Sequence, residues 1–287
     1  MRYPATELVL DGNGAVYHLG LLPQQLADQI ILVGDQDRVQ KISRFFDKIE
    51  HQVQHREFVS HTGWYQQKRI TVLSTGIGTD NIDICIQELD ALVNIDLINR
   101  SDKPEKKSLE IVRIGTCGIL QPTLPVHSWI LSTHALGLDN VAHFYPIEFN
   151  QEEQQLLASI NKQVSFPKNI IPYLSAADLN LVDRFRSEKV NTGITVTSSG
   201  FYGPQGRSLR MESKMRNIHL QLGAFESKEQ KIMNFEMESS AIFALGKALG
   251  HRCTTLCLGV ANRPLEEFST GIDKEMDALI KYVLDRI

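Results

Sequence analysis

Short apolar runs alternate with amphipathic helical patterns along this chain, and this alternation constrains its fold more than any other feature. Residues 29–34 form an apolar run that ends at a glycine, and Asp35 is placed to cap the helical pattern that follows. Residues 70–75 and 80–95 repeat the same order. Strands separated by amphipathic helices predict a parallel or mixed sheet with helices on both faces.

Turn residues and further apolar runs complete the predicted order of elements. Thr62-Gly63 is predicted to be the turn between a strand at 53–60 and the strand at 70–75. Residues 115–118 are predicted to be a glycine-rich turn that ends a strand at 111–114. Further strands are predicted at 129–132, 192–198 and 254–260, and further helices at 238–249 and 273–287.

The chain shows no internal repeat, low-complexity tract or interdomain linker. We therefore expect one α/β domain over residues 1–287, with three layers in which helices flank a mixed central β-sheet, and with residues 1–15 as an N-terminal extension. The polar segment 99–108 is expected to be an exposed loop. Ligands of such sheets bind at the carboxyl ends of strands, so the segments that follow the predicted strands are the first candidates for a site.

Composition and charge narrow the class of partner. A net charge of -4 and a pI of about 6.1 offer no general attraction for nucleic acid or for an anionic membrane. No apolar stretch approaches the ~20 residues of a membrane helix, and no basic segment followed by an apolar run suggests a signal peptide, so we expect a cytoplasmic protein. The four cysteines lie in apolar segments, which favours buried free thiols over a metal site.

Two segments carry residues suited to a nucleoside. Gln205 and Arg207 lie two residues apart in a turn-rich loop, where a planar amide and a guanidinium can hold the edge of a polar heterocycle. Glu236 and Glu238 flank Met237 at the start of a helical pattern, and carboxylates accept hydrogen bonds from sugar hydroxyls. The helix dipole alone also favours acids at a helix start, so this second segment has a purely structural alternative.

Arginines beside glycine-containing turns suggest an oxyanion site. Gly34 lets a ligand approach the backbone after a strand, and Arg38, one turn into the helix, can reach the same anion. Arg113 lies inside an apolar strand and must meet a carboxylate or a bound anion, and Thr116 adds a hydroxyl nearby. Arg56 is a further candidate. An ordinary turn, a structural ion pair and a surface position stay open as alternatives for these residues.

In their order along the chain, these motifs resemble the nucleoside phosphorylase superfamily, and within it the uridine phosphorylases. The resemblance runs from Tyr17 to near the C-terminus. It rests on the segments His18-Leu-Gly-Leu, Gly34-Asp-Gln-Asp-Arg-Val, His55-Arg-Glu-Phe, Ser74-Thr-Gly-Ile-Gly, Arg113-Ile-Gly-Thr and Glu236-Met-Glu-Ser. It implies a nucleoside phosphorylase-like fold and a pentosyltransferase that cleaves a pyrimidine nucleoside, uridine above all, reversibly and with phosphate to the free base and ribose 1-phosphate.

The resemblance also implies a role for each matching residue. The implied phosphate-binding positions are Gly34, Arg38, Arg113 and Thr116, with Arg56 supplied by a neighbouring subunit. The implied ribose-binding positions are Thr116, Glu236, Met237 and Glu238, with His18 supplied by the neighbour. The implied base-binding positions are Phe201, Gln205, Arg207 and Arg263. Among all of these, the expected catalytic residues are Arg207, Gln205, Glu238 and Arg113.

Partners and cofactors follow from the same resemblance. Inorganic phosphate is the implied co-substrate, and no cofactor is required. Because His18 and Arg56 are expected to serve a neighbouring site, the chain is expected to form a homo-oligomer, a dimer or a hexamer, with shared active sites. Glu57, Ile70 and Ser74 match a potassium site at the dimer interface of the family.

Some positions depart from the family pattern. Val33 stands where the family usually has proline, the base loop around Gly203-Pro204 is one residue shorter, and 99–108 is an insertion. The choice among uridine, deoxyuridine and thymidine therefore stays open. A purine nucleoside phosphorylase is disfavoured because no Asp lies near Asn262-Arg263, and a hydrolytic nucleosidase because it has little use for three phosphate-directed arginines. A catalytically silent nucleoside-binding protein on the same fold is the remaining alternative.

Overall fold

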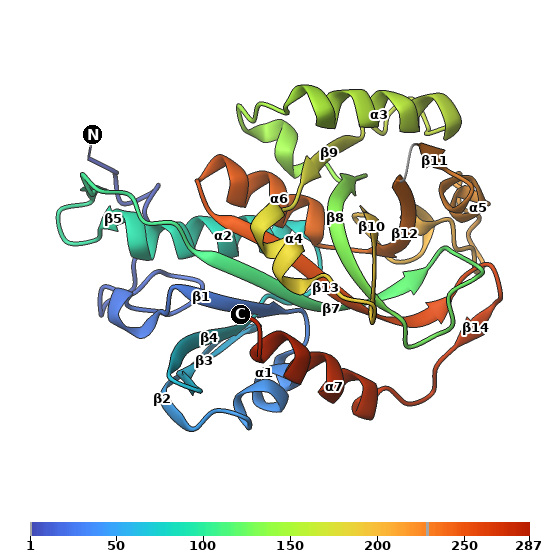
Figure 1. The fold of residues 1–287 in the computed structure, drawn as a ribbon. Helices are drawn as coiled ribbons and strands as arrows, with labels where there is room; N and C mark the ends of the chain where they lie inside the picture. The colour runs from blue at the N-terminus through green and yellow to red at the C-terminus, as the bar shows by residue number, and fades with distance from the viewer. Residues whose placement is uncertain (1, 228–229) are drawn as a thin grey trace.

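The computed structural model describes residues 2–227 and 230–287, which form a mixed β-sheet with helices on both sides (Figure 1). The strands are β1 (Gln29–Val33), β2 (Lys48–His55), β3 (Phe58–Tyr65), β4 (Lys68–Ser74), β5 (Ile95–Asp96), β6 (Ser101–Asp102), β7 (Glu110–Ile119), β8 (Trp129–Gly137), β9 (Tyr173–Ala176), β10 (Val190–Thr197), β11 (Glu226–Ser227), β12 (Gln230–Glu236), β13 (Arg252–Asn262) and β14 (Glu267–Phe268). The helices are α1 (Gln36–Ser43), α2 (Thr79–Asn94), α3 (Gln151–Gln163), α4 (Leu179–Phe185), α5 (Ile218–Gly223), α6 (Ser239–Ala248) and α7 (Asp273–Leu284), with short 3-10 turns η1 (Pro23–Gln25), η2 (Val141–Phe144) and η3 (Gly203–Gln205). The predicted α/β fold with a mixed central sheet is confirmed.

The main sheet has the strand order β11-β12-β10-β8-β13-β7-β1-β4-β3-β2. Strands β4, β1, β7 and β13 run parallel, so their carboxyl ends meet at one edge of the sheet. At its far end β7 also pairs with β12, where Ile119 lies opposite Asn234, and this pairing closes β7, β13, β8, β10 and β12 into a ring. The first half of β7 thus belongs to an open sheet and its second half to a closed one.

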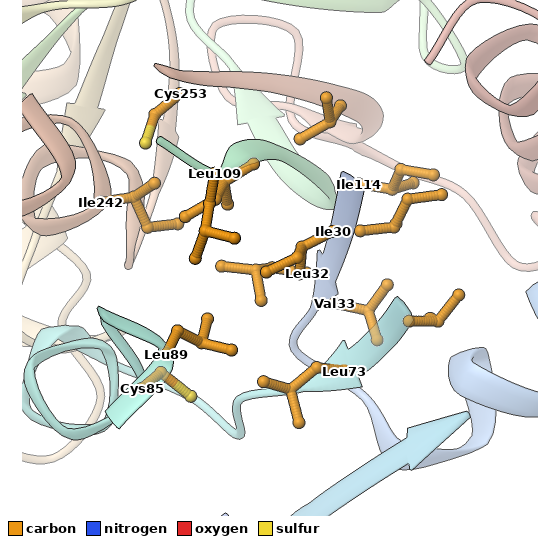
Figure 2. Packing of buried hydrophobic residues seen from close by; sticks show 14 of the residues in the cluster. Ile30, Leu32, Val33, Leu73, Cys85, Leu89, Leu109, Ile114, Ile242 and Cys253 are labelled. Atoms are coloured by element: carbon orange, nitrogen blue, oxygen red, sulfur yellow. The ribbon is translucent and has the colours of Figure 1, made fainter. Parts of the chain in front are cut away.

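Helices cover both faces of the central strands. Helices α2 and α6 pack together on one side, and ion pairs from Lys41 and Arg44 join α1 to α7 on the other (Figure 1). Ile30, Leu89 and Ile242 belong to the large core between the sheet and the α2–α6 layer (Figure 2). Four successive residues of β1 are buried, as expected for a strand that is covered on both faces.

The N-terminal residues are fastened to the segment 99–108. The backbone N of Tyr3 donates to the backbone oxygen of Arg100 at 2.7 Å, and the Arg100 guanidinium donates back to the oxygens of Tyr3 and Pro4. Most residues of the segment are exposed, as predicted, although it also contains β6, which pairs with β5. No helix in the described ranges is both long and apolar enough to cross a membrane.

Both turns predicted from glycines are wrong. Thr62 and Gly63 lie inside β3, and the chain reverses instead at Arg56 and at Gln66-Gln67, which have positive φ. The predicted strand at 53–60 therefore contains the β2–β3 turn. Residues 115–118 likewise lie inside the ten-residue strand β7.

Close packing explains these strand glycines. A Cβ on Gly63 would overlap the Lys48 backbone oxygen and lie 2.8 Å from Phe46 Cδ2. A Cβ on Gly115 would overlap the guanidinium of Arg113. A glycine within a strand can mark a close approach by another group as well as a turn, and the sequence pattern does not distinguish the two.

We expect Gly63→Ala to destabilise the protein by about 1–3 kcal/mol, because the added methyl has to displace the backbone of β2. Gly12→Ala is the matched control, since a Cβ at Gly12 meets nothing within 4 Å, and its effect should stay within about 0.5 kcal/mol. The free energy of unfolding in urea measures both. Equal effects of the two substitutions would contradict the close-packing explanation.

Candidate active site

A cavity of about 1190 Å³ opens where the carboxyl ends of the central strands meet. The predicted site residues that line it are Gly34, Arg38, Glu57, Arg113, Thr116, Phe201, Gln205, Arg207, Glu236, Met237, Glu238 and Arg263. The other predicted site residues, His18, Arg56, Ile70 and Ser74, are not part of its lining. The structure thus gathers segments from across the chain into one site, as the order of strands and helices predicts.

Strand β7 runs along the cavity and separates its two ends. The Arg113 guanidinium lies over Gly115, whereas Gly118 faces the base loop, where its Cβ would lie 3.8 Å from Arg207 Nη2 and 3.5 Å from Arg263 Cγ. Three residues of strand separate the two glycines by about 10 Å. The Arg113 end and the end with Arg207 and Arg263 are therefore distinct places along one strand.

Arg113 is held by a buried ion pair. Its side chain donates to Glu238 Oε2, and its Nη1 lies 3.4 Å from Glu236 Oε2, with all three residues no more than 5 % exposed. Burial favours the neutral guanidine, but the two carboxylates outweigh it and hold the pKa of Arg113 above its usual value. Burial also raises the pKa of Glu238, and Arg113 opposes that shift. The structural ion pair is thus present, but Arg113 Nε is buried without a hydrogen-bond partner among the described residues, and contact of Arg113 with phosphate stays a prediction.

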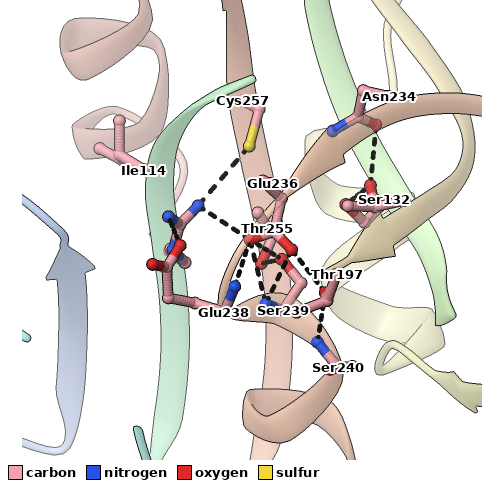
Figure 3. A network of polar contacts seen from close by, with 12 residues as sticks. Ile114, Ser132, Thr197, Asn234, Glu236, Glu238, Ser239, Ser240, Thr255 and Cys257 are labelled. Atoms are coloured by element: carbon pink, nitrogen blue, oxygen red, sulfur yellow. Dashed lines mark hydrogen bonds and ion pairs between the residues drawn. The ribbon is translucent and has the colours of Figure 1, made fainter. Parts of the chain in front are cut away.

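The two carboxylates have different surroundings (Figure 3). Glu236 accepts from the backbone N of Glu238 and Ser239 at 3.0 Å and from the hydroxyls of Ser239 and Thr197. Its oxygens are therefore occupied by the turn between β12 and α6. Glu238 accepts from Arg113 and from the backbone N of Gly78 at 2.8 Å. Glu238 thus has lone pairs left for a ligand, whereas Glu236 acts as an internal support.

The turn after β1 forms the anion-facing end. Asp35 caps α1 by accepting from the backbone N of Asp37, as predicted, and Gly34 lies close to the turn after β4, where its Cβ would be 3.4 Å from the Gly76 oxygen. Arg38 points inward and donates to the backbone oxygen of Ile114 at 3.3 Å. Burial, and then the charge of Arg113, lower the pKa of Arg38, so a bound anion would stabilise its charged form.

The base loop forms the opposite end. The Arg207 side chain donates to the oxygen of Gln205 and to the backbone oxygen of Phe201, and its guanidinium lies 3.9 Å from the Phe201 ring centre. Arg263 Nη1 donates to the backbone oxygen of Gln205 at 3.2 Å. Burial, and then the charge of Arg263, lower the pKa of Arg207 to about 10. The predicted pairing of amide and guanidinium is thus present, and the two are bonded to each other.

His18 and Arg56 lie together outside the cavity. His18 Nδ1 is 2.6 Å from Glu88 Oε1, and the Arg56 guanidinium lies 5.6 Å from the ring centre of Tyr17. Arg56 is exposed, has a positive φ of 55° in the β2–β3 turn, and does not line the cavity of its own chain. Their role in a neighbouring site stays a prediction.

The three residues matched to a potassium site are only partly brought together. The Ser74 hydroxyl donates to the backbone oxygen of Glu57 at 2.9 Å. Ile70 lies opposite Gly63, four residues before Ser74 on β4, which places it about 13 Å away along the strand. One chain therefore does not gather the set. Within the described part of the chain no group of three or more His, Cys, Asp or Glu residues could hold a metal ion, and all four cysteines are buried and free.

The cavity also contains residues that the sequence does not single out. His219, from α5, lines the base end, Asn81 from α2 packs on Gly76, and Glu267 and Phe268 of β14 border the opening. His219 follows the buried Ile218 in a short helix, so its only signal is a polar residue beside an apolar stripe. That signal is common to surface helices and points to no ligand.

Comparisons with known proteins agree with this geometry. A profile described as the Phosphorylase superfamily matches residues 28–285. The chain is 29% identical to a uridine phosphorylase of Thermococcus kodakarensis (96% of this chain, 87% of that one) and 30% identical to one of Haemophilus influenzae (88% of each). A crystal structure of a Trypanosoma brucei nucleoside phosphorylase, described as showing uridine phosphorylase activity, superposes with a TM-score of 0.88 at 29% identity (98% of this chain, 99% of that one). The family predicted from the motifs is confirmed, and the chain belongs to the Phosphorylase superfamily.

Proposed function

We propose that this protein cleaves uridine with inorganic phosphate to give uracil and ribose 1-phosphate. One observation carries the proposal: β7 separates an anion-facing end from a heterocycle-facing end by about 10 Å, with Glu238 and Met237 lining the same cavity. This order matches the phosphate, ribose and base of the reactants. The uridine phosphorylases among its relatives support the same reaction.

The reaction exchanges one bond at the sugar. A phosphate oxygen attacks C1′ while the bond from C1′ to the base nitrogen breaks, and the electron pair of that bond leaves with the base. The proton of hydrogen phosphate ends on the base, which is released as uracil. The protein has to align the phosphate and C1′ and to stabilise charge on the sugar and the base as it develops.

Each end of the cavity stabilises one charge. Arg38 and the turn at Gly34 hold the phosphate, with Thr116 beside it. Glu238 accepts from the ribose hydroxyls and places negative charge near the sugar as it becomes cationic. Arg207 stays charged below about pH 10 and meets the negative charge on the base carbonyl. Arg113 holds Glu238 in place through the buried ion pair.

Glu236 is assigned a positioning role in place of direct ribose binding. Its carboxylate joins the start of α6 to Thr197 at the end of β10, and its Oε2 lies 3.4 Å from Arg113 Nη1. The ribose hydroxyls therefore meet Glu238 and Met237. This assignment departs from the expectation for Glu236 because its lone pairs are already used within the chain.

The active unit is proposed to be an oligomer with shared sites. His18 and Arg56 lie on the outer surface beside Tyr17, and Tyr17 and Ile77 are exposed apolar residues. A second copy on this surface would bury them and bring Arg56 toward the phosphate of the neighbouring cavity. The phosphate would then be bound by the guanidinium groups of both Arg38 and the neighbour's Arg56, and guanidinium groups bind phosphate oxygens through paired hydrogen bonds.

Release of uracil from uridine tests the reaction directly. Product should form only when phosphate is present, with ribose 1-phosphate in equal amount. Release without phosphate would identify a hydrolase, and calorimetric binding without any release would identify a silent binding protein. A panel that includes inosine separates pyrimidine from purine preference.

Arg207→Ala should lower kcat/KM for uridine by about 10²–10³, because it removes the donor that meets charge on the leaving base. Arg210→Ala, an exposed position three residues away, is the control and should leave kcat/KM unchanged. Phosphorolysis assays and a thermal melt of each variant provide the measurement. Wild-type kinetics in Arg207→Ala would rule out the assigned role.

Subunit mixing tests the shared site. Arg56→Ala and Arg207→Ala should each be weakly active alone, because each damages every site. After co-expression and random assembly, about a quarter of the sites should carry neither change, so activity should recover toward a quarter of the wild-type value. Arg207→Ala mixed with Gln205→Ala is the control. Both residues serve the site of their own chain, so every site in the mixture carries one of the two changes. Recovery in the control, or none in the test, would contradict sharing.

A further inference from the structure

The base end of the cavity contains two guanidinium groups, and the acceptors of its loop are already bonded to them. Arg207 and Arg263 offer only donors. The side-chain oxygen of Gln205 and the backbone oxygen of Phe201 both accept from Arg207. A uracil ring carries a ring N–H between two carbonyl oxygens, so it needs one acceptor from the protein as well as donors. When Gln205 turns its oxygen to that N–H, Arg207 loses a partner.

His219 places an imidazole at this end. It lines the cavity, and its Nδ1 is buried without a hydrogen-bond partner in residues 2–227 and 230–287. The charged groups that face it are Arg207 from the base loop and Arg263, which follows β13. The pKa of His219 is lowered mainly by burial, and further by the positive charges of Arg263 and Arg207. The imidazole is therefore neutral near pH 7. A neutral imidazole has one acceptor nitrogen, which the two guanidinium groups could use.

Packing fixes this imidazole close to the base loop. Gly206 lies between Gln205 and Arg207 with a φ of 74°, and a Cβ there would lie 2.5 Å from the Met215 oxygen and 2.9 Å from Ile218 Cγ2. The start of α5 is thus in direct contact with the loop. His219 is the next residue after Ile218, so movement of α5 relative to Gln205 and Arg207 is restricted.

We propose that His219 is a positioning residue for base recognition: its Nδ1 accepts the Arg207 N–H that is released when the base N–H takes the Gln205 oxygen. Nδ1 is shielded from solvent, so its partner is a protein group that moves to it and not the ligand itself. The arrangement lets Arg207 exchange partners without leaving a buried polar atom unpaired. The inference rests on the proposed function, because it assumes a ring with an N–H beside a carbonyl.

Three variants separate an acceptor at Nδ1 from simple packing. His219→Asn places an amide oxygen near the position of Nδ1, His219→Gln places it near Nε2, and His219→Phe keeps the ring without an acceptor. We expect KM for uridine to rise about tenfold in the Phe and Gln variants and to stay near wild type in the Asn variant. KM for phosphate should be unchanged in all three, since His219 faces Arg207 and Arg263 at the base end and not the anion end.

The pH profile adds a readout that packing would not change. Protonation of His219 removes its acceptor, so the wild-type KM for uridine should rise as the pH falls below the ordinary histidine range of about 6.5. The Asn variant should lack this rise. Calorimetric affinity for uridine, measured without phosphate, should follow the same order of variants.

Four results would overturn the inference. An Asn variant no better than the Phe variant would show that packing, and not an acceptor, matters at this position. Equal increases in KM for uridine and phosphate would show a general disturbance of the cavity. A wild-type protein that fails to cleave uridine in phosphate would refute the proposed function and the inference together, whereas an active wild type with unaffected variants would refute the inference alone.

Discussion

The buried contact between Arg113 and Glu238 is the interaction on which the rest of the site depends. A guanidinium inside an apolar strand has to be paired, and the pairing carboxylate lies on the turn between β12 and α6. This contact joins two elements that are 125 residues apart in the chain. It also brings Glu238 under the backbone N of Gly78, after β4. The middle of β7, the turn after β12 and the turn after β4 are thereby held around one carboxylate, and Glu238 lines the cavity between them.

Glu236 stabilises the turn that carries Glu238. Buried carboxylates are costly unless their lone pairs are filled, and here the filling groups are the first amides of α6 and two hydroxyls. The start of α6 donates backbone hydrogen bonds to Glu236, and the positive end of its helix dipole also favours the negative charge of this carboxylate. The two glutamates, separated by one residue, both line the cavity, but the oxygens of Glu236 are bonded within the turn, whereas Glu238 accepts from only Arg113 and Gly78.

Much of the fold and of the site could be predicted from the sequence, because apolar periodicity reports on burial and the family motifs lie at strand ends. The limits of prediction are specific. Gly63 and Gly115 resemble turn residues but permit close contact with Lys48 and with the Arg113 guanidinium. His219 belongs to the site only through the packing of α5 on Gly206, which depends on the folded chain. The sequence of α5 contains no motif from which that contact could be predicted.

The double membership of β7, in an open sheet near Arg113 and in a closed ring near Gly118, has a consequence for local unfolding. Because β7 pairs with β1 of the open sheet and with β12 and β13 of the ring, unfolding of β7 itself breaks ladder pairs in both parts. Substates in which β7 is unfolded at only one of the two ends are disfavoured, because local opening usually follows units that have separate contacts. Unfolding of β7 therefore removes the Arg113 end and the Gly118 end of the strand together, even when the loops around the opening move.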